Sequence, residues 1–356
     1  MSVLISQRRS SQIYRLVLAF LVCGPAFVAR DSSAELEKPA PASSPPLLIA
    51  HRGASAYAPE HTLASYRLAI DLGADFVEQD LQVTRDGVLI CMHDPELTRT
   101  TDVKDVFPNK AASRNPEEQG KPKRGWYTVD FSLEEIKKLD AGSWFNRANP
   151  FAAKPEYAGA RIATLQEVIS DVRDRAGLYI EIKHYEFYKS LGYDVIDKLV
   201  SILNANGFNS SGRRDHIFIQ SFSKASLLKI RAAAPQYARI QLLPMEDRGR
   251  TQDTSKVSAS LAREVALYAK GVGPAKQMIR SAADVETFHS AGLLVHPYTF
   301  RGPTTAVNRR PLGETQAGGL TLRQLIVADI DSYLTFGVDG GFTDYTDLWV
   351  QAVKAR

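Results

Sequence analysis

The chain of 356 residues contains 44% hydrophobic and 24% charged residues and has a formal net charge of +4. This composition is typical of a folded globular protein and excludes a disordered or fibrous chain. Residues 1–34 contain four arginines and one aspartate, so the rest of the chain carries 40 basic and 39 acidic residues. A balance this close to neutral argues against nucleic-acid binding.

The first residues, 1–34, have the pattern of a secretory signal peptide. A basic segment ending at Arg15 precedes the almost wholly apolar run Leu16–Ala29, and small and polar residues follow. The run is short for a membrane span and contains Gly24 and Pro25, which favours a cleaved signal over a retained anchor. We expect an exported, periplasmic or secreted protein whose mature chain does not insert stably into a membrane.

A proline-rich segment, residues 35–46, follows the signal and predicts an extended linker. Cys91 is the only cysteine after residue 34, so an internal disulfide is excluded for the mature chain.

From residue 47 to the end, residues 47–356, short apolar runs alternate with helical patterns. Continuous apolar runs are typical of parallel strands covered on both faces, and the alternation favours a (β/α)8 barrel over a doubly wound sheet. Thr164–Glu167 and Ser132–Glu135 have the pattern of capping boxes that open helices. The predicted helices are 62–72, 195–204, 223–233, 280–290 and 321–335. The predicted strands are 47–51, 76–82, 88–93, 178–183, 216–221, 239–243, 269–273, 293–298 and 338–343.

The barrel has eight places for these nine strands. We expect 269–273 to be the extra one, because its Gly-x-Gly-Pro sequence limits strand pairing. Residues 95–163 are rich in Pro, Lys, Gly and Asn and are too long for a structureless loop in a compact domain. They predict a subdomain inserted after the third strand, over one mouth of the barrel.

Carboxylates interrupt the apolar runs near the carboxyl ends of predicted strands, where barrel enzymes place their active sites. Glu78 and Asp80 are two residues apart, so both point to one face of a strand. Two such carboxylates repel each other, and a divalent cation would resolve the repulsion. Glu181, on another strand, could complete an oxygen-rich site for Ca²⁺ or Mg²⁺. The alternative is a structural ion network with Arg52 and Lys183.

Two histidines, His51 and His93, follow early strands and suit general acid–base catalysis near neutral pH. Arg52 offers a planar fork for a phosphate group. His184 follows Lys183 and is expected at the mouth of the barrel. Three further histidines are interpreted as structural: His61, His216 and His289.

These residues resemble the ordered motifs of the glycerophosphodiester phosphodiesterase family, in particular its periplasmic bacterial members. The similarity covers about residues 47–348, and its motifs gain specificity from their order and spacing. His61 stands where many relatives have Asn, at a position expected to touch no proposed metal or acid–base residue. The similar segments are His51-Arg52-Gly53, Pro59-Glu60-His61-Thr62, Glu78-Gln79-Asp80, His93-Asp94, Glu181-Ile182-Lys183, Gln220-Ser221-Phe222, Val272-Gly273-Pro274, Val295-His296-Pro297-Tyr298-Thr299 and Gly340-Gly341-Phe342-Thr343-Asp344.

The resemblance implies a role for each matching residue. It implies His51 and His93 as the acid–base pair, Arg52 and Lys183 as phosphate contacts, and Glu60 as a supporting residue beside His51 or the metal. It further implies hydrolysis of small glycerophosphodiesters to sn-glycerol 3-phosphate through a cyclic phosphate. The implied cofactor is one divalent cation, with Ca²⁺ favoured over Mg²⁺. Its implied ligands are Glu78, Asp80 and Glu181.

Aromatic residues near later strand ends, Phe222, Tyr298 and Phe342, are candidates for an apolar wall against the substrate, although each is equally compatible with the core. Two other enzymatic readings keep the barrel and change the substrate, to intact phospholipids or to a glycerol-phosphate polymer. A third reading is a surface adhesin or binding protein. The sequence does not predict the oligomeric state.

Overall fold

The computed structural model describes residues 45–117, 121–210, 216–245, 256–301, 311–316 and 318–356. The predicted signal peptide and residues 35–44 of the predicted linker lie outside these residues. The chain divides into two units, 1–35 and 36–356, and everything below concerns the second. No helix within the described part of the chain has the length and apolar character needed to cross a membrane.

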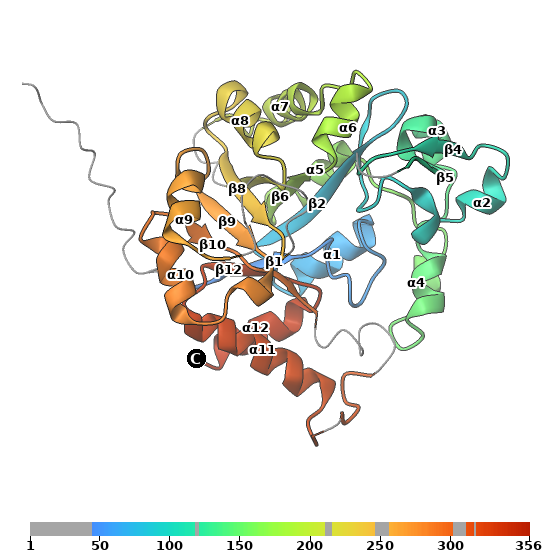
Figure 1. The fold of residues 1–356 in the computed structure, drawn as a ribbon. Coiled ribbons are helices and arrows are strands. Elements are labelled where there is room, and N and C mark those ends of the chain that lie inside the picture. The colour runs from blue at the N-terminus through green and yellow to red at the C-terminus, as the bar shows by residue number, and fades with distance from the viewer. Residues whose placement is uncertain (1–44, 118–120, 211–215, 246–255, 302–310, 317) are drawn as a thin grey trace, which may run out of the picture. The chain divides into compact units, whose positions relative to one another are not determined.

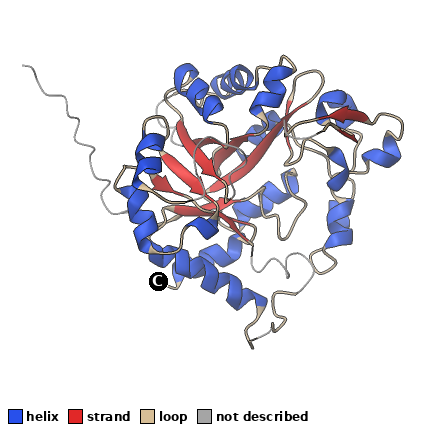
Figure 2. Cartoon of the chain, in the orientation of Figure 1, coloured by secondary structure: helices blue, strands red, loops and turns tan. Residues whose placement is uncertain are grey.

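The central element is a sheet in the strand order β10-β9-β8-β7-β6-β2-β1-β12-β11, and neighbouring strands along this order are parallel (Figures 1 and 2). The strands are β1 (Leu47–Ala50), β2 (Phe76–Val83), β6 (Gly177–Ile182), β7 (Ile217–Ser221), β8 (Ala238–Leu243), β9 (Gly271–Pro274), β10 (Leu294–Val295), β11 (Tyr298–Phe300) and β12 (Gly340–Thr343).

The sheet closes at β10 and β11, which are consecutive pieces of one extended segment. On one side, the His296 N–H donates to the Val272 carbonyl of β9. On the other side, the Asp339 and Phe342 N–H groups donate to the carbonyls of Val295 and Pro297. The segment therefore joins the two ends of the sheet, and the predicted (β/α)8 barrel is confirmed.

The predicted choice of the extra strand is wrong. Residues 269–273 contribute β9 to the barrel, whereas the run 88–93 forms β3 (Leu89–Cys91), which pairs antiparallel with β2 outside the parallel series. A Cβ on Gly271 would lie 2.7 Å from the Leu294 carbonyl oxygen, so glycine here permits close strand packing instead of preventing pairing. Gly87, at φ +75°, closes the turn that folds β3 back onto β2.

Helices follow most strands and pack around the barrel, which is the arrangement expected of parallel strands buried on both faces (Figure 1). Both predicted capping boxes are present, at Ser132 and Thr164. The helices that follow barrel strands or cover them are α1 (Leu63–Asp71), α5 (Leu165–Val172), α6 (Tyr185–Ser190), α7 (Val195–Ala205), α8 (Lys224–Ala233), α9 (Ala259–Ala266), α10 (Ala282–His289), α11 (Leu322–Phe336) and α12 (Thr346–Lys354).

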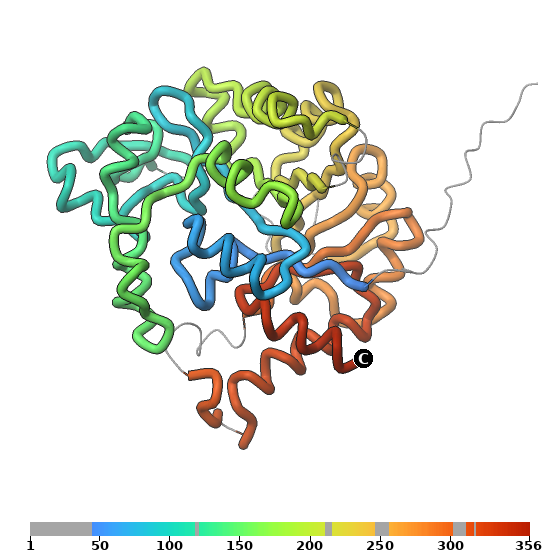
Figure 3. The backbone as a smooth tube through the Cα atoms, turned by 180° about the vertical axis from the view of Figure 1, so that it is seen from behind, coloured from blue at the N-terminus to red at the C-terminus, as the bar shows by residue number. Residues whose placement is uncertain are grey.

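The segment that follows β3 lies beside β2 (Figure 3). Its side chains Leu97, Val103, Phe131 and Ile136 belong to an apolar cluster separate from the main core. We call residues 95–163 the insert. Its elements are η1 (Leu97–Arg99), α2 (Val103–Val106), β4 (Ala112–Arg114), β5 (Lys123–Gly125), η2 (Thr128–Asp130), α3 (Leu133–Ile136), α4 (Ser143–Ala148) and η3 (Pro155–Tyr157).

Aromatic side chains fill the inside of the barrel and form a floor beneath the polar strand ends. Phe76, Tyr179, Phe218 and Phe342 belong to one buried cluster, and the rings of Tyr179 and Phe218 stack with centroids 4.9 Å apart. Side chains alternate along a strand. Residues two and four positions after these aromatics in β2 and β6 therefore also point into the barrel, which brings carboxylates to its carboxyl-terminal mouth.

Candidate active site

A cavity of about 1270 Å³ opens at the carboxyl ends of the barrel strands. Among the predicted site residues, Glu60 is placed behind Arg52, and the others line the cavity. Those lining residues are His51, Arg52, Glu78, Asp80, His93, Glu181, Lys183, Phe222 and Tyr298. His184 and Phe342 line it as well. The predicted acid–base, carboxylate and phosphate-contact residues therefore share one space.

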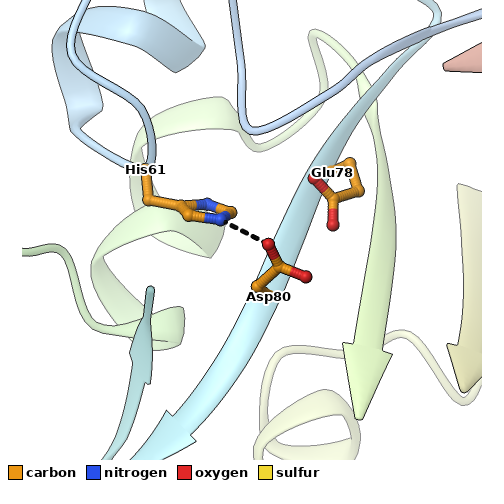
Figure 4. A group of neighbouring side chains, drawn as sticks. All are labelled: His61, Glu78 and Asp80. Atoms are coloured by element: carbon orange, nitrogen blue, oxygen red, sulfur yellow. Dashed lines mark hydrogen bonds and ion pairs between the residues drawn. The ribbon is translucent and has the colours of Figure 1, made fainter. Parts of the chain in front are cut away.

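The carboxylates come from two adjacent strands. Glu78 and Asp80 project from β2 (Figure 4). Asp80 is the register partner of Glu181 on β6. Glu78 Oε2 accepts a 2.7 Å hydrogen bond from the Arg52 backbone N–H. Lys183 Nζ lies 3.2 Å from Glu181 Oε1 and 3.6 Å from Asp80 Oδ1. One lysine thus bridges carboxylates of both strands.

The prediction that His61 touches no proposed metal ligand is wrong. Its Nε2 donates to Asp80 Oδ2 at 2.9 Å (Figure 4), and its Nδ1 accepts from the Tyr66 hydroxyl at 2.8 Å. His61, Glu78 and Asp80 each bring one possible ligand atom within 4.8 Å of the others. With its Nε2 proton directed at Asp80, His61 also fixes the orientation of that carboxylate.

The electrostatics of the cluster fit a divalent cation. Burial and then the charges of Asp80 and Glu181 raise the pKa of Glu78 well above its ordinary value. Burial also raises the pKa of Glu181 to about 8, although Lys183 opposes the shift. Burial would raise the pKa of Asp80 too, but Lys183 and the nearby histidines hold it well below its usual range. Three buried carboxylates thus share two cationic side chains, Arg52 and Lys183, and oxygen ligands of this kind suit a hard cation.

Each proposed catalytic histidine is oriented by a carboxylate. His51 Nδ1 donates to Asp344 Oδ1 at 2.7 Å, and His93 Nδ1 donates to Asp94 Oδ1 at 2.7 Å. Because an ionised carboxylate only accepts, both Nδ1 atoms hold the proton. The neutral ring therefore leaves Nε2 as the free base in both histidines.

Burial is the main reason why both histidines are neutral. It lowers the pKa of His51 to about 4, with help from Arg52. It lowers the pKa of His93 to about 4 as well, with help from Lys183 and Arg52. Asp344 and Asp94 oppose these shifts without cancelling them. A neutral imidazole is the form that a general base requires.

Arg52 is held in place by three carboxylates. Its Nη1 donates to Glu60 at 3.2 Å, its Nε lies 3.5 Å from Asp80 Oδ2, and its backbone N–H donates to Glu78. The Arg52 backbone has φ 59°, a conformation that costs a non-glycine residue free energy. The surrounding contacts compensate for that strain and keep the guanidinium at the cavity.

The aromatic wall lies on the opposite, late-strand side. Phe222 and Tyr298 meet edge to face with centroids 6.0 Å apart, and the Tyr298 hydroxyl donates to the Leu243 carbonyl at 3.1 Å. His184, at φ 44°, places its Nδ1 3.2 Å from the Pro116 carbonyl of the insert. The two aromatic rings thus line the cavity beside polar side chains of the late strands, such as Gln220 and Arg301.

Sequence patterns predicted no role for the two carboxylates that hold the histidines. Asp344 directly follows the last strand, and Asp94 directly follows His93. Each therefore lies near a strand end, as the predicted site residues do. Neither partner could be inferred locally, because a carboxylate next to an apolar strand is a weak signal alone. Of the histidines interpreted as structural, His289 pairs with Asp339 at 2.8 Å, near the start of β12, and His216 is exposed.

A parallel barrel with histidines, clustered carboxylates and cationic side chains at its carboxyl-terminal mouth is typical of one class of enzyme, the barrel hydrolases of anionic substrates. The glycerophosphoryl diester phosphodiesterase family pattern matches residues 51–348. The chain belongs to this family, and the predicted enzyme class is confirmed.

Individual relatives agree with this assignment. A glycerophosphodiester phosphodiesterase of Bacillus subtilis is 37% identical, with 86% of each chain covered. One from Arabidopsis thaliana is 34% identical, with 85% of each chain covered. Among solved structures, an Oleispira antarctica phosphodiesterase in complex with the product sn-glycerol-3-phosphate has a TM-score of 0.61 at 24% identity, covering 87% of this chain and 97% of its own. The last similarity supports the fold.

Proposed function

We propose that the chain hydrolyses glycerophosphodiesters to sn-glycerol 3-phosphate and an alcohol, using His51 and His93 as the acid–base pair. The observation that supports this most is the pairing of each histidine with its own carboxylate, Asp344 or Asp94, at one cavity. The B. subtilis and A. thaliana relatives have names that describe the same activity.

In the proposed reaction, one histidine takes the proton of the glycerol 2-hydroxyl as its oxygen attacks phosphorus. The other histidine gives a proton to the departing alcohol, and a cyclic phosphate results. Water then opens the ring with the two proton transfers reversed, and sn-glycerol 3-phosphate is released. Arg52 and Lys183 contact the phosphoryl oxygens and stabilise the charge that develops there. The negative charge of the bound phosphodiester raises the pKa of the histidine that acts as the acid.

The proposed cofactor is one divalent cation held by Glu78, Asp80 and Glu181, with His61 orienting Asp80. When bound, the cation supplies positive charge to the phosphoryl oxygens. Ca²⁺ is favoured over Mg²⁺ because protein oxygens supply the site, whereas Mg²⁺ usually keeps several of its waters.

The proposed location is outside the cytoplasm, in the periplasm or beyond. The basic and apolar pattern of residues 1–34 supports it. Amino-terminal sequencing of the protein recovered from the periplasm and the medium tests it, since a chain that stays cytoplasmic and keeps residue 1 contradicts export.

The activity is tested by measuring glycerol 3-phosphate released from glycerophosphocholine with Ca²⁺, with Mg²⁺ and with chelator. We expect activity to require the cation and to be lost in His51→Ala and His93→Ala proteins that remain folded. Undiminished turnover after complete metal removal would refute the cofactor. Hydrolysis of phospholipid vesicles without hydrolysis of the deacylated diester would refute the substrate class.

A further inference from the structure

Arg99 binds two carboxylates, and each of them contacts a residue of the proposed catalytic machinery. Its Nη2 and Nη1 donate to the two carboxylate oxygens of Glu60 at 2.6 and 3.0 Å, and its Nε donates to Asp94 Oδ2. The other oxygen of Asp94 accepts from His93 Nδ1. Glu60 in turn accepts from Arg52 Nη1. A continuous series of hydrogen bonds thus runs from the acid–base His93 to the phosphate contact Arg52.

The backbone of Arg99 is fixed by the insert. Arg99 ends the short helix η1, whose cap Glu96 accepts from the Thr98 N–H at 3.0 Å and from the Trp126 N–H at 3.0 Å. The Leu97 side chain is fully buried in the apolar cluster of the insert, and the Leu97 N–H donates to the Trp126 carbonyl at 2.8 Å. The guanidinium therefore projects from an anchored turn.

The charges along the series are complementary. Burial would raise the pKa of Glu60, but Arg52 and Arg99 hold it well below its ordinary value. Burial would likewise raise the pKa of Asp94, but His93 and Arg99 hold it low. Both carboxylates are therefore ionised. The planar guanidinium can bind both at once, which a lysine ammonium on a flexible stem does poorly.

We propose that Arg99 is a positioning residue, which holds Asp94 and Glu60 and, through them, keeps His93 and the Arg52 guanidinium at a fixed separation. The inference rests on the proposed function of His93 and Arg52. It also gives the insert a role in catalysis, since the insert supplies the anchored arginine that keeps a proton-transfer group aligned with a phosphate contact.

The first test compares Arg99→Gln with Arg114→Gln in steady-state kinetics. Arg114 is a matched control, because it also lies in the insert, is similarly exposed and pairs with a carboxylate, that of Asp130. We expect Arg99→Gln to lower kcat about 10–100-fold, the usual effect of losing a support behind a reacting group, with a smaller change in KM. Arg114→Gln should stay within about twofold of the wild type, the scatter typical of surface substitutions.

Two further experiments separate positioning from general damage. Guanidinium ion added to Arg99→Ala should restore part of kcat and none in Arg114→Ala. The double variant Arg99→Gln, Asp94→Asn should lose little more activity than the worse single variant, because both substitutions break the same connection. Losses that multiply, or an Arg99→Gln kcat equal to that of Arg114→Gln, would overturn the proposal.

A measurement that does not depend on turnover tests the role of Arg99 separately from the proposed function. NMR of labelled histidine ring nitrogens should show the Nδ1–H form of His93 in the wild type and a mixture of ring forms in Arg99→Gln and Arg99→Lys. Unchanged His93 signals in both variants would overturn the positioning role, even in a chain without diesterase activity. Absence of activity in the wild type, together with altered His93 signals in the variants, would refute the proposed function alone.

Discussion

His51 and Asp344 are 293 positions apart in the sequence and 2.7 Å apart in the structure. His51 follows the first barrel strand and Asp344 follows the last, and β1 and β12 are neighbours in the sheet. The carboxylate is buried, and the pKa of Asp344 falls to about 2 because Arg301 and His51 outweigh the effect of burial. The pair is therefore an ionised acceptor beneath a neutral imidazole, and it fixes which ring nitrogen faces the cavity.

Replacing Asp344 with Asn should lower kcat by about 100-fold, because an amide can also donate and so permits the wrong ring form of His51. The measurement is steady-state hydrolysis of glycerophosphocholine beside a melting curve. Asp347→Asn is the matched control, since Asp347 accepts from the Tyr57 hydroxyl at 2.5 Å and serves no histidine. Equal kcat in the two variants would contradict the role of Asp344.

In metal-free protein, the contribution of Glu181 to stability should fall as the pH rises from about 5 to about 8, against the opposite contribution of the buried histidines. Burial raises the pKa of Glu181 from 4.5 to about 8, so the folded chain keeps a proton that the unfolded chain releases. That contribution to stability is complete below 4.5 and is lost as the pH rises through 8. The difference in melting temperature between wild type and Glu181→Gln, measured in chelator, should therefore change with pH over this range. The control Glu186→Gln, at the cavity rim, should keep the wild-type pH dependence. The same unaltered pH dependence in Glu181→Gln would refute the raised pKa of Glu181.

The same cluster predicts how added cation changes stability. A cation that binds only the folded chain raises its melting temperature by mass action. The rise should be larger in the wild type than in Glu181→Gln, which has one charged oxygen ligand fewer. Titration of Ca²⁺ and Mg²⁺ into chelator-treated protein, followed by melting temperature, measures this. Equal rises in both proteins would place the cation elsewhere.

The His289–Asp339 pair should stabilise the fold in acid more than in base. The Asp339 carboxylate raises the pKa of His289 above 6.5, and burial only partly opposes it. The stabilisation is therefore complete below 6.5 and is lost as the pH rises through the raised value. For this half-buried pair we expect about 0.5–1 kcal/mol. Urea melts of His289→Gln and wild type should differ near pH 5.5 and converge near pH 8.5; a constant difference would contradict the prediction.

Gly177→Ala should destabilise the barrel by about 1–3 kcal/mol, as overpacking usually does. A Cβ at Gly177 would lie 2.2 Å from the Phe76 ring, which is itself packed edge to face against Tyr179 and Phe218. Adding Phe76→Leu should recover part of the loss. Gly313→Ala is the control, because its Cβ would meet nothing within 4 Å. Denaturant unfolding measures all three, and a neutral Gly177→Ala would show that the ring can move aside.

Local patterns predicted the features that depend on a few consecutive residues. The two-residue spacing of Glu78 and Asp80 places both carboxylates inside the barrel, and the Thr164 capping box opens α5 as expected. The barrel itself could be predicted because apolar runs and helical periods alternate from residue 47 onward, on both sides of the insert. Such signals need no knowledge of which strands become neighbours.

Features set by tertiary contacts were missed or misread. The Asp86-Gly87 pair is a hairpin signal that could have identified β3 as antiparallel. The glycines of the Gly-x-Gly-Pro segment are typical of a broken strand, although close packing of Gly271 against Leu294 requires a residue without a side chain. His61 reaches Asp80 from a loop residue at φ 57°, a backbone conformation that the sequence alone does not reveal.

The position of β1 between β2 and β12 has a consequence for the nascent chain. Until β12 is in place, the first strand has one open edge, and His51 lacks the acceptor that fixes its ring. The proposed role of His51 therefore requires a chain that has been synthesised at least as far as Asp344 and folded so that β12 lies beside β1. Any fragment that ends before Asp344 should lack the proposed activity.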